Sequence, residues 1–385
     1  MKLIELFNKD MTPNWAKIFS IDQFKAMLET PQSKDWHKEG NVAIHTQNVT
    51  KNMQDYLDNV LCVTRGSDYY KMMMCAAICH DLGKTTTTKF NEKTQDYTCK
   101  YHGLEGDKIC RLLFWDDPDI ELREKVCYMV RHHMDVFYLN KDDELYKRTM
   151  RMSWGYVPVK DMCILNYCDA TGSVNDFEDS EAVEKRLMEV KRAAEDMKCF
   201  HSEYVFDTNK QKLNFFYNQE EAVQIKNKST LTVYIMVGIA GAGKDTWIAK
   251  NKPELPVLCR DTIRTEIGLK GDKPFGTPEQ ENDVTRIFNE RMMQYCSENK
   301  SFIINNTNIK KMRRDELIKQ MLKYNPKIVM VYVEAPSIKE LKERRKGQIK
   351  PSVISRMAHD LEFPEKYEYN ELIIHKQYGD KEYKS

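Results

Sequence analysis

The sequence predicts a multidomain α and α/β protein in which an all-helical domain precedes a domain with a parallel sheet. Between residues 20 and 200, apolar residues recur at spacings of three and four, the period of an amphipathic helix. After residue 230, short runs rich in Val and Ile alternate with helical patterns, which is typical of βα units on a parallel sheet. The length of 385 residues also favours two domains over one.

The first domain is expected to be helical throughout, because no alternating strand pattern stands out before residue 200. The stretch 199–230 is polar and has little periodicity, so we expect the linker between the domains to end there. We therefore place the domains at residues 1–225 and 226–385. The helical patterns lie near residues 42–62, 68–82, 104–114, 120–133, 160–170 and 179–198.

The second domain contains five short apolar runs that we expect to be strands, with helical patterns between most of them. Such alternation favours crossover connections and hence a parallel sheet. The runs are Leu231–Val237, Pro256–Cys259, Phe302–Ile304, Ile328–Val333 and Leu372–Ile374.

Composition excludes several classes of protein. Apolar residues make up 41% of the chain and charged residues 31%, enough for packed cores and too apolar for a disordered chain. The longest apolar runs, Met72–Cys79 and Leu231–Gly238, are shorter than the 18 or so residues of a membrane span. The first ten residues have no signal-peptide core, and the eleven cysteines form no CxxC pair. We expect a cytoplasmic protein with free thiols and no membrane contact.

The near-neutral net charge of +1 is unevenly distributed. Residues 1–200 carry 28 Lys and Arg against 33 Asp and Glu, and residues 201–385 carry 32 against 26. The first part is therefore acidic and the second basic. A basic domain favours a polyanionic partner.

A phosphate-binding loop is predicted directly after the first strand of the second domain. The run from Gly238 through Gly241, Ala242 and Gly243 to Lys244 fits G-x-x-x-x-G-K between a strand and a helix. Glycines let backbone N–H groups converge on phosphate oxygens, and the lysine reaches the terminal phosphates. We therefore expect ATP or another nucleoside triphosphate, with Mg²⁺, as the cofactor.

The residue after the lysine departs from that motif. Ser or Thr normally holds Mg²⁺ there through its hydroxyl, but here Asp245 follows Lys244, and Thr246 comes next. Asp245 could hold the ion directly or through water, or the site could hold the ion less tightly. The sequence leaves these alternatives open.

A candidate acceptor site follows the second predicted strand. Asp261 lies where ligands bind in open parallel sheets, and a carboxylate there can take the proton of an attacking hydroxyl. Arg264, three residues later, could hold a phosphate beside that hydroxyl. A simple helix cap is the structural alternative for Asp261.

Histidine and aspartate residues recur in a definite order in the first domain. Neutral imidazoles and carboxylates without cysteine suit Mn²⁺, Co²⁺, Ni²⁺, Zn²⁺ or Fe²⁺ in an open rather than a structural site. Such an ion can assist hydrolysis of a phosphoester. The residues are His45, His80, Asp81, His102, His132, His133 and Asp169.

The second domain resembles the polynucleotide 5′-kinases of phage and bacterial RNA repair, over about residues 230–376. The matching elements are Gly238–Thr246, Arg260-Asp261 with Arg264, Asn306-Thr307-Asn308, and a lid at Leu341–Lys346. Asn305 and Asn306 stand where that family usually has an Asp, and the two lid arginines are adjacent rather than a helical turn apart. The resemblance implies nucleotide-binding roles for Gly238, Gly241, Ala242, Gly243, Lys244, Asp245, Thr246, Arg345 and, as an alternative to a solvent-facing position, Arg344. It implies catalytic roles for Lys244, Asp261 and Arg264.

The first domain resembles the HD-domain phosphohydrolases over about residues 40–170. The order H…HD…H…H…D and the words HDLGK and HGLEG carry the resemblance. It implies that His45, His80, Asp81 and Asp169 bind a metal ion. It further implies that His102 and His132, with His133 as the alternative to His132, hold a second ion or contact phosphate, and that Lys84 contacts the substrate phosphate. His37 and His201 lack motif context, and His359-Asp360 is expected to be structural.

The order of the two domains resembles bifunctional end-healing enzymes of RNA repair. The implied activities are ATP-dependent phosphorylation of a 5′-OH and removal of a 2′,3′-cyclic or 2′/3′-phosphate. The implied partners are RNA ends, with DNA ends as the open alternative, and a separate RNA ligase. Two other readings remain: an HD nucleotidase fused to a nucleoside or other small-molecule kinase, and a non-enzymatic, nucleotide-gated binding module.

Overall fold

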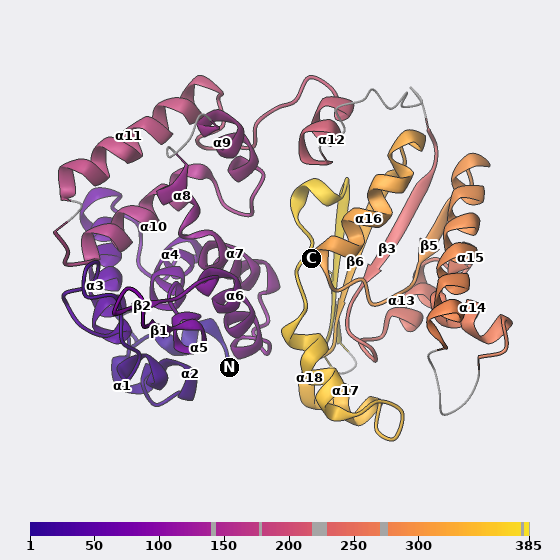
Figure 1. Ribbon diagram of the computed structural model, residues 1–385, viewed down its shortest axis with the longest axis horizontal. Helices are drawn as coiled ribbons and strands as arrows, with labels where there is room; N and C mark the ends of the chain where they lie inside the picture. The colour runs from indigo at the N-terminus through magenta and orange to yellow at the C-terminus, as the bar shows by residue number, and fades with distance from the viewer. Residues whose placement is uncertain (140–143, 177–178, 218–228, 270–275, 379–380, 385) are drawn as a thin grey trace. The chain divides into compact units, whose positions relative to one another are not determined.

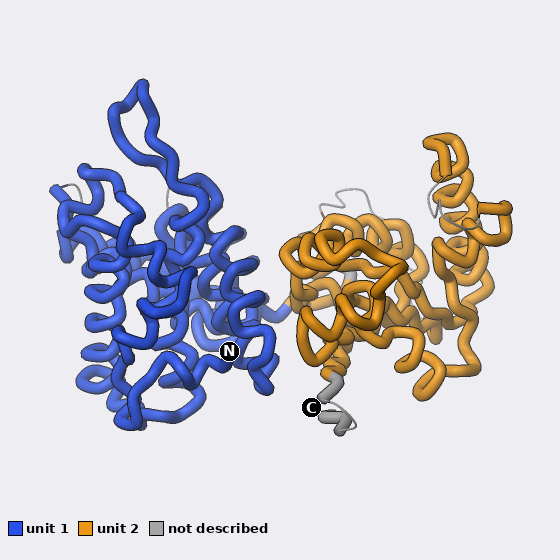
Figure 2. Tube along the Cα trace, turned by 90° about the horizontal axis from the view of Figure 1, so that it is seen from below, with its two compact units in different colours: residues 1–205 blue, residues 206–385 orange. Residues whose placement is uncertain are grey.

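The chain folds into two compact units, Met1–Val205 and Phe206–Ser385 (Figure 2). The structure is a computed structural model, and it describes residues 1–139, 144–176, 179–217, 229–269, 276–378 and 381–384. The predicted boundary between residues 225 and 226 lies outside the described residues. Helix α12, Asn209–Tyr217, precedes it and is part of the second unit, where Phe216 stacks on Tyr367.

The first unit is helical, as expected (Figure 1). Helix α3 packs against α4 and α10, and α7 packs against α4 and α6. The helices are α1 (Trp15–Ile18), α2 (Asp22–Lys25), α3 (Val42–Asp55), α4 (Asp68–Cys79), α5 (Lys84–Thr87), α6 (His102–Leu113), α7 (Ile120–His132), α8 (Asp135–Tyr138), α9 (Leu145–Ser153), α10 (Val159–Gly172) and α11 (Ser180–Asp196).

Helix α4 is the centre of this unit. Its residues from Met72 to Cys79 are all buried, as expected of a helix that is apolar on every side. Ser67 caps its first turn by accepting a hydrogen bond from the backbone N–H of Tyr70. Because the chain leaves the helix at His80, these contacts place His80 and Asp81 inside the unit.

A two-stranded hairpin interrupts the helices, which the sequence analysis did not predict. Strands β1 (Lys89–Asn91) and β2 (Asp96–Thr98) pair antiparallel, and the rings of Phe90 and Tyr97 lie 5.2 Å apart. Strands of three residues are too short to show a convincing alternation in the sequence.

The second unit contains a sheet with the order β4-β5-β3-β6-β7-β8. The first five strands are parallel, which confirms the predicted fold class, and β8 adds an antiparallel edge that was not expected. The strands are β3 (Thr232–Val237), β4 (Val257–Leu258), β5 (Phe302–Ile304), β6 (Lys327–Glu334), β7 (Glu371–Tyr378) and β8 (Lys381–Lys384). The helices between them are α13 (Lys244–Asn251), α14 (Arg260–Glu266), α15 (Pro278–Ser297), α16 (Lys311–Met321), α17 (Ile338–Arg344) and α18 (Pro351–His359).

Strand β3 lies between β5 and β6, and β5 lies between β3 and β4. In a parallel sheet the carboxyl ends of all strands lie at the same end of the sheet, and ligands bind just beyond them. The loops after β3, β4 and β5 therefore meet there. No helix in the described part of the chain is long and apolar enough to cross a membrane.

A buried ion pair fixes the loop after β5. The Arg314 guanidinium on α16 donates to both carboxylate oxygens of Glu368, at 2.6 and 3.0 Å, and to the carbonyl oxygens of Asn308 and Glu362 at 3.0 Å. Neither side chain of the ion pair is exposed. Arg314 thereby connects the loop after β5 with the segment before β7.

Replacing Arg314→Met should lower the free energy of unfolding of the second unit by about 3–5 kcal/mol, because Glu368 would remain buried without its cation. Arg313→Met is the matched control: Arg313 is 67% exposed and pairs with Glu316 in the next turn, so about 1 kcal/mol or less is expected. Urea denaturation of both variants measures the difference. Equal losses would contradict a special role for Arg314.

Candidate metal centre and nucleotide site

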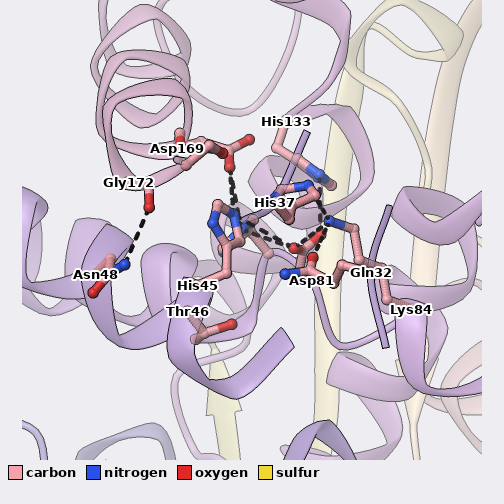
Figure 3. A network of polar contacts seen from close by, with 12 residues as sticks. Gln32, His37, His45, Thr46, Asn48, Asp81, Lys84, His133, Asp169 and Gly172 are labelled. Atoms are coloured by element: carbon pink, nitrogen blue, oxygen red, sulfur yellow. Dashed lines mark hydrogen bonds and ion pairs between the residues drawn. The ribbon is translucent and has the colours of Figure 1, made fainter. Parts of the chain in front are cut away.

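Four predicted metal ligands of the first unit meet in the structure. Figure 3 labels three of them, His45, Asp81 and Asp169. His45 Nε2 lies 2.9 Å from Asp169 Oδ1 and 3.3 Å from His80 Nε2. Asp81 Oδ2 lies 3.4 Å from His80 Nε2 and 3.6 Å from His45 Nε2. Helix α3 supplies the first histidine, the end of α4 supplies His80 and Asp81, and α10 supplies Asp169. Two imidazoles and two carboxylates thus point at one position.

The second oxygen of Asp81 faces two further histidines. Asp81 Oδ1 lies 3.5 Å from His102 Nε2 and 3.7 Å from His133 Nε2, and these two nitrogens are 3.0 Å apart. Gly83 permits this arrangement, because a Cβ atom there would lie 1.9 Å from the carbonyl oxygen of His102 at the start of α6. Asp81 is thus shared by two groups of donors, each able to hold an ion.

His132 lies apart from these groups. Its Nδ1 is 2.7 Å from Asp135 Oδ2, and its ring packs against Tyr128 at 4.5 Å. The spacing of the histidines in the sequence does not decide between His132 and His133. Adjacent residues at a helix end point in different directions, so the two rings lie in different surroundings. The structure brings His133 to Asp81.

Three of the histidine rings are oriented by the same kind of contact with the backbone. Nδ1 of His80, His102 and His133 lies 2.7–2.8 Å from the backbone carbonyl oxygen three residues earlier. A carbonyl oxygen only accepts, so Nδ1 carries the proton and Nε2 points at Asp81. Such contacts fix the tautomer that binds a metal.

His45 is oriented by a carboxylate that the sequence analysis missed. Glu39 Oε1 lies 3.0 Å from His45 Nδ1 and 2.9 Å from His37 Nδ1, and Glu39 Oε2 accepts from the backbone N–H of Val174. Carboxylate–histidine–metal arrangements of this type raise the basicity of the ligand. His37 lacks motif context in the sequence, but its Nε2 lies 3.4 Å from Lys84 Nζ. Its closeness in sequence to Glu39 and His45 is the only signal that could have suggested its place.

Lys84 is nearly fully buried beside Asp81. Its Nζ lies 2.7 Å from Asp81 Oδ2, donates to Gln32 Oε1 at 2.9 Å and lies 3.4 Å from His37 Nε2. Burial disfavours the charged ammonium, but the carboxylate of Asp81 outweighs it and raises the pKa of Lys84. A buried ammonium in this position can also attract a phosphate oxygen.

The electrostatics of the cluster fit a divalent cation. Burial disfavours an imidazolium at His80, but Asp81 and Asp169 outweigh it and raise the pKa of His80 to about 10. Burial, together with the neighbouring His133, lowers the pKa of His102 to about 3, so that ring stays neutral. Both oxygens of Asp81 are buried, and neither accepts a hydrogen bond of good geometry from a donor in the described residues. A metal ion would satisfy these oxygens and take the place of the proton on His80.

A cavity of about 640 Å³ opens onto this cluster. Asp81, Lys84, His102, His133 and Asp169 form one part of its wall. Its volume is in the range of small-molecule sites. A phosphoester in the cavity would therefore lie next to the candidate metal ligands.

In the second unit, the loop after β3 has the geometry of a phosphate cradle. Gly241 adopts a φ of +88°, which other residues rarely do, and its chain segment turns directly into α13. Lys244 Nζ donates to the carbonyl oxygens of Gly238 and Ile239 at 2.9 and 3.1 Å. Burial, with Arg345 nearby, lowers the pKa of Lys244 to about 8. Negatively charged phosphate oxygens would raise this pKa again.

Two of the departures from the kinase pattern, Asp245 and Asn305, contact each other. Asn305, after β5, donates from Nδ2 to Asp245 Oδ1 at 2.6 Å. The carboxylate expected at the end of β5 thus comes from the helix after the phosphate loop instead. Asn306 makes a different contact: its Oδ1 accepts a hydrogen bond from the backbone N–H of Arg260. Thr246 is exposed one residue further along α13.

The acceptor residues lie at the start of α14. Asp261 is 88% exposed, and its Oδ1 accepts from Arg264 Nη1 at 2.6 Å. Arg264 also donates to both oxygens of Glu281, at 2.9 and 2.8 Å. The N-cap position of α14 is Cys259, without a side-chain cap, so Asp261 does not cap this helix.

Both lid arginines lie at the phosphate loop. Arg344 Nη1 donates to the carbonyl oxygen of Gly241 at 3.1 Å, and Arg345 passes so close that a Cβ on Gly241 would lie 3.1 Å from its Cγ. Arg344 also pairs with Glu340, and Arg345 donates to Gln348. Both side chains therefore lie against the loop after β3.

Two family models match separate parts of the chain. Residues 42–164 match the HD domain, and residues 233–362 match a model described as an AAA domain. The chain therefore contains, in this order, a region similar to the HD domain and a region similar to an AAA domain. The HD match ends before Asp169, which the structure nevertheless brings to the cluster.

Other comparisons add little. A solved structure described as a candidate kinase from Chloroflexus aurantiacus J-10-fl covers 39% of this chain and 87% of its own, at 14% identity. The TM-score between the two structures is 0.32. No curated protein matches the chain.

The adjacent histidines provide a test of the metal centre. His133→Ala should weaken metal binding by about 10-fold or more, because it removes a nitrogen that faces Asp81. His132→Ala should leave metal binding unchanged. Titration of both variants with Mn²⁺, followed by metal analysis, measures the difference. The same loss in both variants would contradict the assignment.

The contact between Asp245 and Asn305 makes a prediction about Mg²⁺. Asp245→Ala should weaken Mn²⁺ binding to the protein–ADP complex on the order of 10-fold, or about 1.4 kcal/mol, because it removes the carboxylate beside Lys244. The double substitution Asp245→Ser with Asn305→Asp returns the carboxylate to the strand end and should restore binding. Electron paramagnetic resonance of Mn²⁺ reports the bound fraction. Unchanged binding in Asp245→Ala would show that this carboxylate is not involved.

Proposed function

We propose that this protein repairs polynucleotide ends, with RNA as the substrate. The second unit would transfer the γ-phosphoryl group of ATP to a 5′-OH, and the first would remove a 2′,3′-cyclic or 2′/3′-phosphate. The observation that favours a polymer acceptor is the 88% exposure of Asp261 at the edge that carries the phosphate loop. A nucleoside kinase needs an enclosed acceptor pocket, whereas a strand end can reach an open carboxylate.

In the proposed kinase reaction, Asp261 accepts the proton of the 5′-hydroxyl as its oxygen attacks the γ-phosphorus. The bond from that phosphorus to the β–γ bridging oxygen breaks, and ADP leaves. Lys244, Arg345 and Arg344 stabilise negative charge on the transferred group. Arg264 holds Asp261 in place and can bind a phosphate of the acceptor strand.

In the proposed hydrolase reaction, a bound divalent ion would polarise a phosphoryl oxygen and lower the pKa of water. His45, His80, Asp81 and Asp169 would hold one ion, and Asp81 with His102 and His133 a second. Lys84 would hold a phosphate oxygen beside Asp81, oriented by Gln32 and His37. Water adds to phosphorus, and a ribose oxygen leaves with a proton.

One RNA oligonucleotide with a 5′-OH and a 2′,3′-cyclic phosphate tests both proposed reactions. Asp261→Ala should lower 5′-phosphorylation by about 100-fold or more and leave removal of the 2′,3′-phosphate intact, since the two sites share no described residue. Asp81→Ala should have the opposite effect. Labelled ATP and mass analysis of the 3′ end follow the two reactions.

The same assay separates the proposal from an HD nucleotidase fused to a small-molecule kinase. Free nucleosides are added as competing acceptors. If they are phosphorylated in preference to the oligonucleotide, the small-molecule kinase is correct. Full kinase activity in Asp261→Ala would overturn the acceptor assignment.

A further inference from the structure

The cavity of the first unit has two chemically different parts. One part holds the candidate metal ligands and Lys84. The other contains aromatic side chains from three segments: Trp36 from the loop before α3, Tyr97 from β2, and Phe137 and Tyr138 from α8. No step of the proposed hydrolysis uses these aromatic residues.

The aromatic part is accessible. Trp36 is 42% exposed and Tyr138 is 46% exposed, although both line the cavity. The rings of Trp36 and Phe137 meet edge to face at 6.2 Å, and the Arg186 guanidinium lies 4.9 Å from the centre of the Phe137 ring. Large aromatic side chains are usually buried in a core, so exposed rings at a polar cavity indicate a ligand with a flat, apolar face.

Polar side chains accompany these rings. Asn166, Ser173 and Asn175 line the same cavity, and Arg186 Nη2 donates to Asn166 Oδ1 at 3.1 Å. Amide and hydroxyl groups beside stacking rings are the groups that read the edges of an unpaired base. A volume of about 640 Å³ admits one nucleotide rather than a duplex end.

We propose that this wall is a nucleobase subsite, in which Trp36 and Tyr138 stack on the base of the nucleotide whose phosphate lies at Asp81 and Lys84. The inference rests on the proposed hydrolase function of the same cavity. It adds that the first unit recognises a nucleotide, base included, and not a phosphoester in general. For a polynucleotide, the ligand is the terminal nucleotide splayed away from its neighbour.

The test compares two phosphomonoesters, 3′-AMP and glycerol 2-phosphate, which differ in having a base. Trp36→Ala and Tyr138→Ala should each lower kcat/KM for 3′-AMP by about 5- to 150-fold, the loss of one stacking contact. The value for glycerol 2-phosphate should change less than about twofold. Trp36→Phe should recover most of the activity toward 3′-AMP, because it retains a stacking ring.

Tyr146→Ala is the matched control. Tyr146 is 51% exposed on α9 of the same unit but does not line the cavity, so neither substrate should be affected. An equal loss for both substrates in Trp36→Ala, or no loss for 3′-AMP, would overturn the subsite.

A failure of the hydrolase proposal can be distinguished from a failure of the nucleobase subsite. If the wild-type protein hydrolyses neither ester, equilibrium dialysis with 3′-AMP decides the subsite alone. The proposed reaction is wrong if the 2′,3′-phosphate of the RNA oligonucleotide is not removed either. Weaker binding in Trp36→Ala than in Tyr146→Ala would support the subsite. Equal binding would overturn it.

Discussion

The burial of two carboxylates is the constraint on which the first unit depends. Asp81 lies in the turn after α4 and Asp169 lies on α10, and their side chains are 1% and 14% exposed. Each would be costly to bury without positive charge nearby. The surroundings supply that charge: the pKa values of His80 and Lys84 are raised, and those of both carboxyl groups are held well below their usual range by these cations despite burial. Proton-bearing groups and a metal ion are interchangeable in this role. The cluster is therefore both a folding requirement for α3, α4 and α10 and a candidate site of chemistry.

A different constraint shapes the second unit. A phosphate cradle gathers positive potential from backbone N–H groups, Lys244 and two arginines, and a negatively charged ligand must balance it. One carboxylate near the cradle would suit a hydrated Mg²⁺, and the chain carries it on Asp245 rather than at the end of β5. Asn305 then provides the neutral partner. Relative to the kinase pattern, Asp245 and Asn305 exchange the positions of the carboxylate and the neutral side chain and leave the number of carboxylates unchanged.

The sequence predicted the elements whose cause is local. Helical periodicity, βα alternation and the order of His and Asp residues located both units and most residues of both sites. It could not predict contacts made by tertiary folding: Glu39 behind His45, the choice of His133 over His132, or the approach of Arg344 to Gly241. The hairpin β1–β2 was missed because short strands have no measurable period. The predicted boundary at residues 225 and 226 lies outside the part of the chain that the structure describes, and stays a prediction.

The two reactions proposed for this chain are opposed, and together they would raise a problem of selectivity. A phosphatase that accepted any terminal phosphate would remove the 5′-phosphate that the proposed kinase reaction adds. Metal ions and Lys84 cannot prevent this, because they recognise a phosphate wherever it is attached. A base subsite can, since the distance from base to phosphate differs between the 3′ and 5′ positions of a nucleotide. With Trp36 and Tyr138 fixing the base and Asp81 fixing the reacting phosphorus, the geometry of the cavity rather than the chemistry of its metal centre would decide which end is dephosphorylated.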